Sequence, residues 1–286
     1  MPFDTLQNQL QSIQEEFSGS YALYAEHLGT GAVVSFGEVD RPYETASVMK
    51  LPILVESLRQ CQEGIQDLNQ PVVYRTADYV EGSGVLRYLS PGITLPLRDV
   101  LTLMVIVSDN VATNMVLRTI GIEAVNLMCQ KIGLSHTRVL RTIDFNRSDP
   151  LGLSTPYDMV QLLKAIYFNT VLDGPFAGTA LEILRRQQYQ TLLTRYLPYE
   201  LLDDTDRDLP LVTVASKSGS LTGIRNDVGL VFTPWGDYAI AVMSEASQDR
   251  RFHVDTEAFQ VLPKASRAVF DYFVGEALPI DDTVGR

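Results

Sequence analysis

The feature that most constrains the fold is a change in hydrophobic period along the chain. Five short runs have the composition and period of β-strands: residues 21–28, 32–36, 211–215, 227–233 and 238–244. The long stretch between them repeats its apolar residues at helical spacing. Amphipathic helices are predicted at both ends, over residues 4–18 and 255–276, the second bent near Pro263.

This order of elements predicts an α/β (α+β) protein with two lobes. Residues 1–46 and 205–286 would form one discontinuous α/β lobe, and residues 47–204 a helical lobe inserted into it. A chain of 286 residues that is 45% hydrophobic can bury a sizeable core in such a body. We expect the functional site where the two lobes meet.

The charge balance narrows the class of partner. The chain has 23 Lys and Arg residues against 35 Asp and Glu, a net charge of -12, which argues against nucleic acid. A small anionic ligand is still compatible, because one or two cations in a cleft dominate the local potential. No apolar run is long enough to cross a bilayer, so we expect no membrane partner. The sequence does not specify an oligomeric state, and a monomer is the default expectation.

Cofactors and metals are not expected. The three histidines, His27, His136 and His253, are isolated, and the cysteines form no cluster. Cys61 and Cys129 are interpreted as two buried thiols, with one long-range disulfide as the alternative. The first residues lack the basic and apolar run of a secretory signal, which predicts a cytoplasmic protein; a leader trimmed from this end would make it periplasmic or secreted.

Three short motifs carry residue types suited to nucleophilic catalysis. In SVMK, residues 47–50, Ser47 opens a predicted helix, so its hydroxyl and the Lys50 amine share one face. A neutral lysine can act as the base that a serine nucleophile needs. SDN at 108–110 interrupts two helical stretches, and KSGS at 217–220 ends a predicted strand. Taken singly, the motifs also fit an N-cap serine, a helix cap and a turn.

Together and in this order, the motifs resemble those of the class A β-lactamase-like serine hydrolases, which are penicillin-recognising serine enzymes. The resemblance covers nearly the whole chain and includes residues 84–89 and 217–227. It implies a β-lactamase/transpeptidase-like fold, in which a five-stranded antiparallel sheet is flanked by the N- and C-terminal helices and carries an inserted, all-helical lobe.

The resemblance also implies catalytic roles. Ser47 would be the acylated nucleophile, and Lys50 its proton acceptor or orienting cation. Ser108 would pass a proton to the leaving nitrogen, and Asn110 would bond the amide on the acyl side of the substrate. The backbone N–H groups of Ser47 and Ser220 would form the oxyanion hole.

Substrate binding is implied in the same way. Lys217 would supply positive potential at one end of the cleft, and Ser218 would bind a substrate carboxylate. Arg225 is a candidate second cation for that carboxylate, with an ion pair to Asp227 as the alternative. The expected partner is therefore a small molecule with a carboxylate, either a β-lactam or a peptide-like compound.

One departure from the family pattern concerns deacylation. Class A β-lactamases carry a glutamate on an omega-shaped loop, which activates the water that hydrolyses the acyl-enzyme. Here no glutamate lies between Glu123 and Glu182, and the corresponding stretch, residues 138–154, is short. Asp144 is the nearest acidic substitute, and the alternative is an aspartate that turns the loop.

The sequence therefore predicts a serine hydrolase that forms an acyl-enzyme on Ser47. β-Lactam hydrolysis is the leading activity, weakened by the missing glutamate. One alternative is a D-Ala-D-Ala-type peptidase, an amidase or an esterase that β-lactams acylate with slow turnover. A second alternative, of another class, is a non-catalytic binding protein on the same fold.

Overall fold

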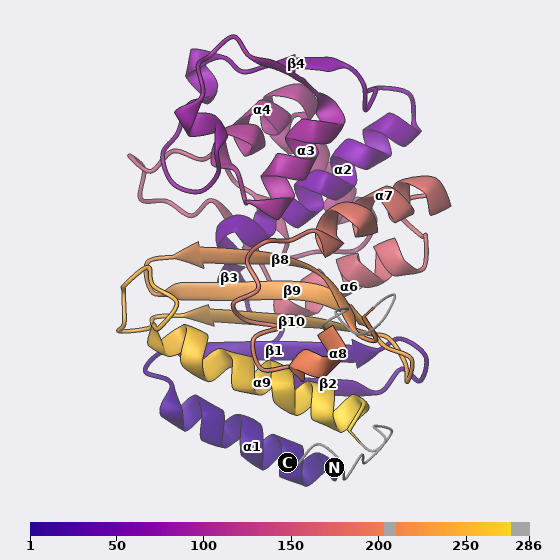
Figure 1. Ribbon diagram of the computed structural model, residues 1–286, viewed down its shortest axis with the longest axis vertical. Helices are drawn as coiled ribbons and strands as arrows, with labels where there is room; N and C mark the ends of the chain where they lie inside the picture. The colour runs from indigo at the N-terminus through magenta and orange to yellow at the C-terminus, as the bar shows by residue number, and fades with distance from the viewer. Residues whose placement is uncertain (203–209, 276–286) are drawn as a thin grey trace.

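The computed structural model describes residues 1–202 and 210–275 (Figure 1). Its main sheet is antiparallel, with the strand order β2-β1-β10-β9-β8. The strands are β1 (Ser20–His27), β2 (Val33–Phe36), β8 (Thr213–Leu221), β9 (Ile224–Phe232) and β10 (Tyr238–Glu245). The predicted five-stranded sheet, drawn from both ends of the chain, is confirmed.

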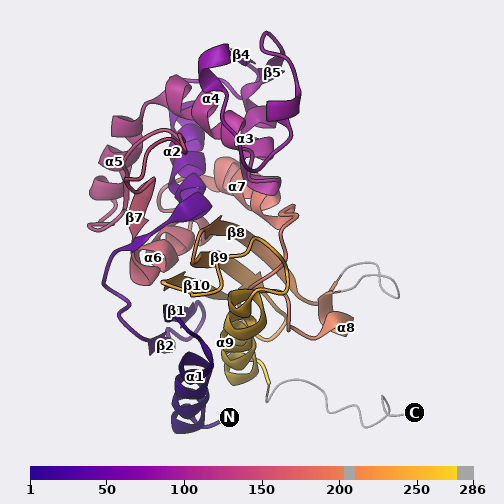
Figure 2. The same cartoon turned by 90° about the vertical axis from the view of Figure 1, so that its left-hand side faces the viewer.

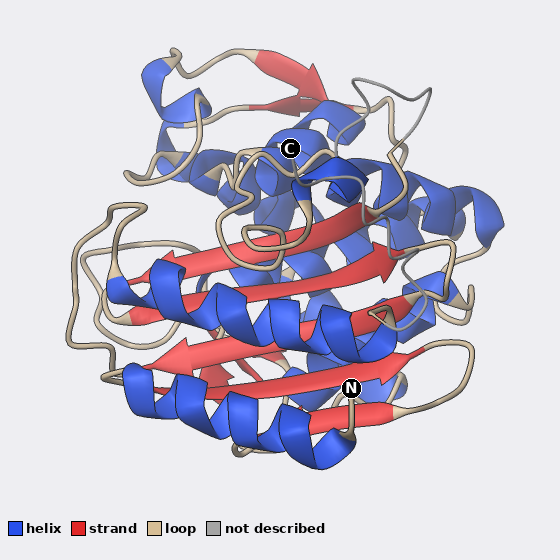
Figure 3. Ribbon diagram, turned by 60° about the horizontal axis from the view of Figure 1, so that its bottom comes forward, coloured by secondary structure: helices blue, strands red, loops and turns tan. Residues whose placement is uncertain are grey.

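Two helices cover one face of this sheet. α1 (Phe3–Glu16) and α9 (Glu257–Phe273) lie side by side across the strands (Figure 3), and Pro263 falls inside α9. Because side chains alternate along a strand, each face has its own core. Leu23 and Ile240 pack in the cluster that includes α1 and α9, whereas Ala22 packs in the cluster of the opposite face.

The opposite face carries most of the remaining helices (Figure 2). α6 contacts β1, β9 and β10, and α7 contacts β8. The helices of this part are α2 (Lys50–Gln62), α3 (Leu97–Ile106), α4 (Asn110–Ile120), α5 (Ile122–Lys131), α6 (Pro156–Tyr167) and α7 (Gly174–Arg185). The short helix α8 (Tyr199–Leu202) lies on the side of α9 (Figure 2), where Leu201 and Leu202 pack against the cluster that includes α1 and α9. Within the described ranges, no helix has both the length and the apolar character needed to cross a bilayer.

The inserted lobe was expected to be all-helical, and this expectation is wrong in detail, because the lobe also contains short strands. Short 3₁₀ turns are η1 (Ala46–Met49), η2 (Thr76–Asp78) and η3 (Leu86–Tyr88). Two small sheets consist of β3 (Tyr43–Glu44), β7 (Gly152–Ser154) and β6 (Arg138–Val139), and of β4 (Pro71–Val73) and β5 (Thr94–Pro96). Strands of two or three residues are too short to show a period of two. The predicted lobe boundary at residue 204 lies outside the described residues.

Both cysteines are free thiols in the structure, so they do not form the disulfide that was the alternative. Cys129 is buried and Cys61 is half-buried. Burial raises the pKa of both thiols, to about 12 for Cys129 and about 11 for Cys61, which makes them poor nucleophiles.

Candidate active site

Ser47 lies in the 3₁₀ turn η1, which leads into α2 and contacts strands β8 and β9 of the main sheet. The preceding residue, Ala46, has a φ of 48°, a left-handed conformation that residues other than glycine rarely adopt. Ala46 and Val48 are buried, whereas Ser47 is half-buried and lines a pocket. The turn therefore presents the hydroxyl of Ser47 to a ligand.

Lys50 follows one turn later, and its Nζ lies 3.1 Å from Ser47 Oγ, as the spacing predicts. Nζ also lies 2.7 Å from Ser108 O, 3.0 Å from Ser108 Oγ and 2.8 Å from Asn110 Oδ1. A carbonyl oxygen can only accept, so Ser108 O and Asn110 Oδ1 take two amine protons. The lone pair of a neutral Lys50 amine is then left for the two hydroxyls.

Burial places the pKa of Lys50 well below its usual range. The ammonium of Lys217 lowers this pKa further, and the carboxylate of Asp109 opposes both effects. The Lys50 side chain is fully buried. Because the lowered pKa favours the neutral amine, Lys50 is suited to accept the proton of Ser47 Oγ.

Residues 108–110 divide two tasks. Asp109 caps α4, because its carboxylate accepts a hydrogen bond from Ala112 N (2.9 Å) and two more from N–H groups at the start of η3. Ser108, with a φ of 51°, and Asn110 instead bond to Lys50. Asp109 is therefore a helix cap, as the alternative predicted, whereas Ser108 and Asn110 form hydrogen bonds with Lys50.

Residues 217–220 lie inside strand β8, which continues to Leu221, and not at the predicted strand end. A Cβ added at Gly219 would lie 2.8 Å from Thr45 O and 2.9 Å from Ser47 N. Only glycine lets the strand approach the Ser47 turn this closely. Ser218 and Ser220, on either side of Gly219, line the same pocket as Ser47.

Lys217 is fully buried, and its Nζ donates to Ser218 O over 2.6 Å. Burial lowers the pKa of Lys217 to about 7, although the Asp227 carboxylate acts to raise it. Burial also raises the pKa of Asp227 to about 7, although hydrogen bonds from backbone N–H groups and the charge of Lys217 act to lower it. Lys217 therefore adds positive potential beside Ser218 on the acid side of neutral pH.

Arg225 lines the pocket, but its side chain is buried and hydrogen-bonded to backbone carbonyl groups. Its guanidinium donates to the carbonyl oxygens of Leu221 (2.6 Å), Ile224 (2.7 Å) and Arg251 (2.5 Å). Its buried Nε has no hydrogen-bond partner in the described part of the chain. Among the described residues no ion pair joins Arg225 to Asp227, so the structure does not contain the alternative pairing.

The pocket has a volume of about 240 Å³ and a mostly hydroxyl-bearing wall. Its polar lining includes Ser47, Ser83, Ser108, Ser218, Ser220 and Arg225. None of the described residues that line it is Asp or Glu. The pocket therefore holds the Ser47 hydroxyl beside a buried lysine, and no carboxylate of the described residues lines it.

Asp144 does not line this pocket. Its carboxylate accepts hydrogen bonds from the backbone N (2.9 Å) and Nδ2 (3.0 Å) of Asn146, which is the loop-turning role given as the alternative. Its neighbour Ile143 is buried and is held by Asn114, which donates to Ile143 O (3.0 Å) and accepts from Ile143 N (2.9 Å). The loop therefore presents an isoleucine, fixed at both backbone groups, to α4.

Sequence reasoning missed two parts of this region. The first is the pairing of Asn114 with Ile143, which residue spacing does not reveal. The second is a loop segment, residues 252–254, that lines the pocket from the far end of the chain. Its Phe252 and Val254 are exposed, so they follow no buried period that a sequence pattern could show.

Comparisons with known proteins agree with this architecture. A β-lactamase of Rhodobacter capsulatus is 27% identical over 273 residues, covering 94% of this chain and 89% of that protein. A solved β-lactamase of Sphaerobacter thermophilus has a TM-score of 0.85 at 26% identity, covering 98% of this chain and 100% of the other. For the structure of PBP-A the TM-score is 0.83 at 27% identity, with 97% and 98% covered.

The five-stranded antiparallel sheet, its flanking helices and the helical part form a β-lactamase/transpeptidase-like fold. Residues 5–273 match the β-lactamase enzyme family. The chain belongs to that family, and the resemblance expected from the three motifs is confirmed.

Proposed function

We propose that this chain is a class A-like serine hydrolase that β-lactams acylate on Ser47 and that hydrolyses the acyl-enzyme slowly. The observation that carries the proposal is the contact between the Ser47 hydroxyl and the buried amine of Lys50 (3.1 Å), whose pKa is lowered. A serine held beside a neutral lysine has the base it needs for nucleophilic attack.

Acylation would proceed in three proton transfers. As Ser47 Oγ bonds to the lactam carbonyl carbon, its proton passes to the lone pair of Lys50 Nζ. The backbone N–H groups of Ser47 and Ser220 would stabilise the oxyanion. When the lactam C–N bond breaks, Ser108 Oγ gives its proton to the leaving nitrogen and regains one from Lys50, 3.0 Å away.

The same lining supports binding of an anionic substrate. Ser218 would bind the carboxylate, in the positive potential of Lys217 and Arg225. Asn110 Nδ2 donates one proton to Glu81 O (3.0 Å), and its second proton is available for the acyl-side amide of the substrate.

Slow deacylation follows from the absence of Asp and Glu among the described residues that line the pocket. This feature also supports the alternative, a D-Ala-D-Ala-type peptidase, amidase or esterase that β-lactams acylate. A mutant of PBP-A has been solved as an acyl-enzyme complex with penicillin G. The intact Ser47, Lys50 and Ser108 contacts favour either enzyme over a non-catalytic binding protein.

A time course of intact-mass spectrometry with benzylpenicillin tests the proposal. We expect one penicilloyl group per chain, formed quickly and lost over many minutes, with the adduct mapped to the peptide that contains Ser47. No adduct at any time would overturn the proposal in favour of a binding protein. Fast turnover without an accumulating adduct would show an efficient β-lactamase and overturn slow deacylation.

Replacing Ile143 by glutamate should accelerate deacylation. Asn114, which holds Ile143, lies four residues and therefore one helical turn from Asn110, a ligand of Lys50 Nζ. Ile143 lines the pocket on the Asn114 side, not the Ser47 pocket. We expect the longer glutamate side chain to extend from residue 143 toward the acylated serine as a general base, and loss of the adduct to become about 10²-fold faster. Stopped-flow and mass spectrometry measure this rate.

Ile143→Gln is the matched control, because it has the same length as the glutamate and cannot ionise. Burial raises the pKa of a carboxylic acid, so the gain in Ile143→Glu should grow with pH as the carboxylate forms. Equal deacylation rates in the Glu and Gln variants would contradict the prediction.

A further inference from the structure

The loop from Ala246 to Thr256, between β10 and α9, supplies side chains to the pocket that holds Ser47. Phe252, His253 and Val254 line this pocket. Phe252 is 67% exposed and Val254 is 50% exposed. These apolar side chains extend the polar pocket and face water. A ligand that covers them removes apolar surface from water, which makes the free energy of binding more favourable.

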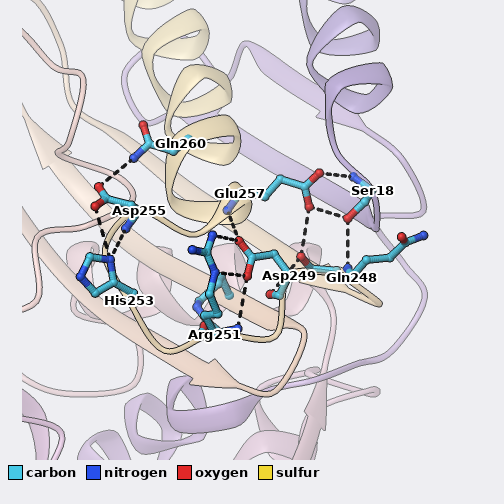
Figure 4. Close-up of polar contacts among 10 residues, drawn as sticks. Ser18, Gln248, Asp249, Arg251, His253, Asp255, Glu257 and Gln260 are labelled. Carbon is cyan, nitrogen blue, oxygen red and sulfur yellow. Dashed lines mark hydrogen bonds and ion pairs between the residues drawn. The ribbon is translucent and has the colours of Figure 1, made fainter.

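The loop is held firmly although its apolar side chains are exposed (Figure 4). The Asp249 carboxylate accepts hydrogen bonds from Arg251 Nε (2.8 Å) and Nη2 (2.6 Å), and from Glu257 N (3.0 Å). The Glu257 carboxylate accepts from Ser18 N (2.8 Å) and Ser247 Oγ (3.2 Å). These bonds fix both ends of the loop, so its wall is largely formed before a ligand arrives.

On the pocket side, Arg225 holds the loop next to the expected carboxylate site. Its Nη2 donates to Arg251 O over 2.5 Å. The guanidinium carbon lies 4.9 Å from the ring centre of Phe252 and 5.1 Å from that of Phe259, within range of cation–π attraction. Arg195 Nη1 donates to Val254 O over 2.9 Å. Phe252 is therefore fixed beside the cation that would attract the carboxylate.

We propose that Phe252 and Val254 form a subsite for an apolar substituent next to the carboxylate of the substrate. The inference rests on the proposed function, because it takes Ser47 as the acylated atom and the end of the pocket at Ser218 and Arg225 as the carboxylate end. In a cephalosporin, the C3 substituent is attached beside the carbon that bears the carboxylate. This substituent contacts Phe252 and Val254 in the bound substrate.

The test compares two cephalosporins with the same thienylacetyl amide but different C3 groups: nitrocefin, with a dinitrostyryl group, and its C3-methyl counterpart. The quantity measured is the ratio of their second-order acylation rate constants. In Phe252→Ala we expect this ratio to fall about tenfold, and in Phe252→Leu, which keeps part of the apolar surface, by less. A general disturbance of Arg225 would slow both probes and leave the ratio unchanged.

Phe168→Ala is the matched control, because Phe168 is also exposed (49%) and is not among the residues that line the Ser47 pocket. Its ratio should equal that of the wild-type chain. A ratio unchanged in Phe252→Ala, with acylation by benzylpenicillin intact, would overturn the subsite alone. Failure of the wild-type chain to be acylated by any of these compounds would overturn the subsite together with the proposed function.

Discussion

Substitution of Ser47 by alanine is expected to abolish the covalent adduct with benzylpenicillin. The variant keeps the binding surface of Ser218 and Arg225 but has no oxygen next to the Lys50 amine at this position. Removal of an activated nucleophile lowers the rate on the order of 10⁴-fold or more. Intact-mass spectrometry after a long incubation measures the loss, and thermal unfolding should be little changed, because Ser47 is only half-buried.

Ser83→Ala serves as the control for the loss of a pocket hydroxyl, since Ser83 is exposed and lines the same pocket. It should form the adduct as the wild-type chain does. Ser108 Oγ also lies 3.0 Å from Lys50 Nζ, so peptide mapping must follow both serines. An adduct on Ser108 in the Ser47→Ala variant would contradict the assignment of the nucleophile.

Replacement of Lys50 by methionine is expected to slow acylation by about 10³-fold, in the range that general bases contribute. Methionine fills a similar buried volume but cannot accept the proton of Ser47 Oγ. In the wild-type chain, acylation should rise with pH as Lys50 passes from ammonium to neutral amine, at a pH well below the usual lysine pKa. The Lys50→Met variant should lack this rise, which stopped-flow measurements over the pH range below the usual lysine pKa would show.

The variant also leaves two buried acceptors, Ser108 O and Asn110 Oδ1, without the Lys50 donor. An unsatisfied buried acceptor costs about 1–3 kcal/mol, so unfolding must be measured beside the kinetics. Lys264→Met is the matched control, because Lys264 pairs with Glu16 on the surface between α1 and α9. Acylation of a folded Lys50→Met variant at the wild-type rate would exclude Lys50 as the base.

Much of the fold is visible in the sequence because the main strands are apolar runs bounded by turn residues, and β9 and β10 are buried at nearly every position. β10 (Tyr238–Glu245) matches its prediction within one residue at the C-terminal end. β8 was predicted to end before Lys217 and continues to Leu221, because its polar residues face the pocket and the Ser47 turn instead of a hydrophobic core. A strand whose polar residues face a binding pocket is therefore not recognised by its hydrophobic pattern.

The site was predictable only as far as short motifs reach. The spacing of Ser47 and Lys50 fixes their contact, since both belong to one helical turn. The addition of Ser108 to this cluster depends on tertiary packing, and the resemblance to a family supplied it. Asp144 was chosen for its charge and its place in the loop, yet its hydrogen bonds are local. No motif or hydrophobic period in the sequence predicted that Phe252 would line the pocket.

Four described residues other than glycine have a positive φ: Ala46, Ser108, Asn169 and Ala246. Asn169 follows α6, where asparagine commonly takes this conformation. The other three are Ala46 in the Ser47 turn, Ser108 between α3 and α4, and Ala246 at the start of the loop between β10 and α9. Each costs about 1–2 kcal/mol relative to a relaxed backbone. The backbone strain of the described residues is therefore concentrated in three segments that contribute side chains to the pocket.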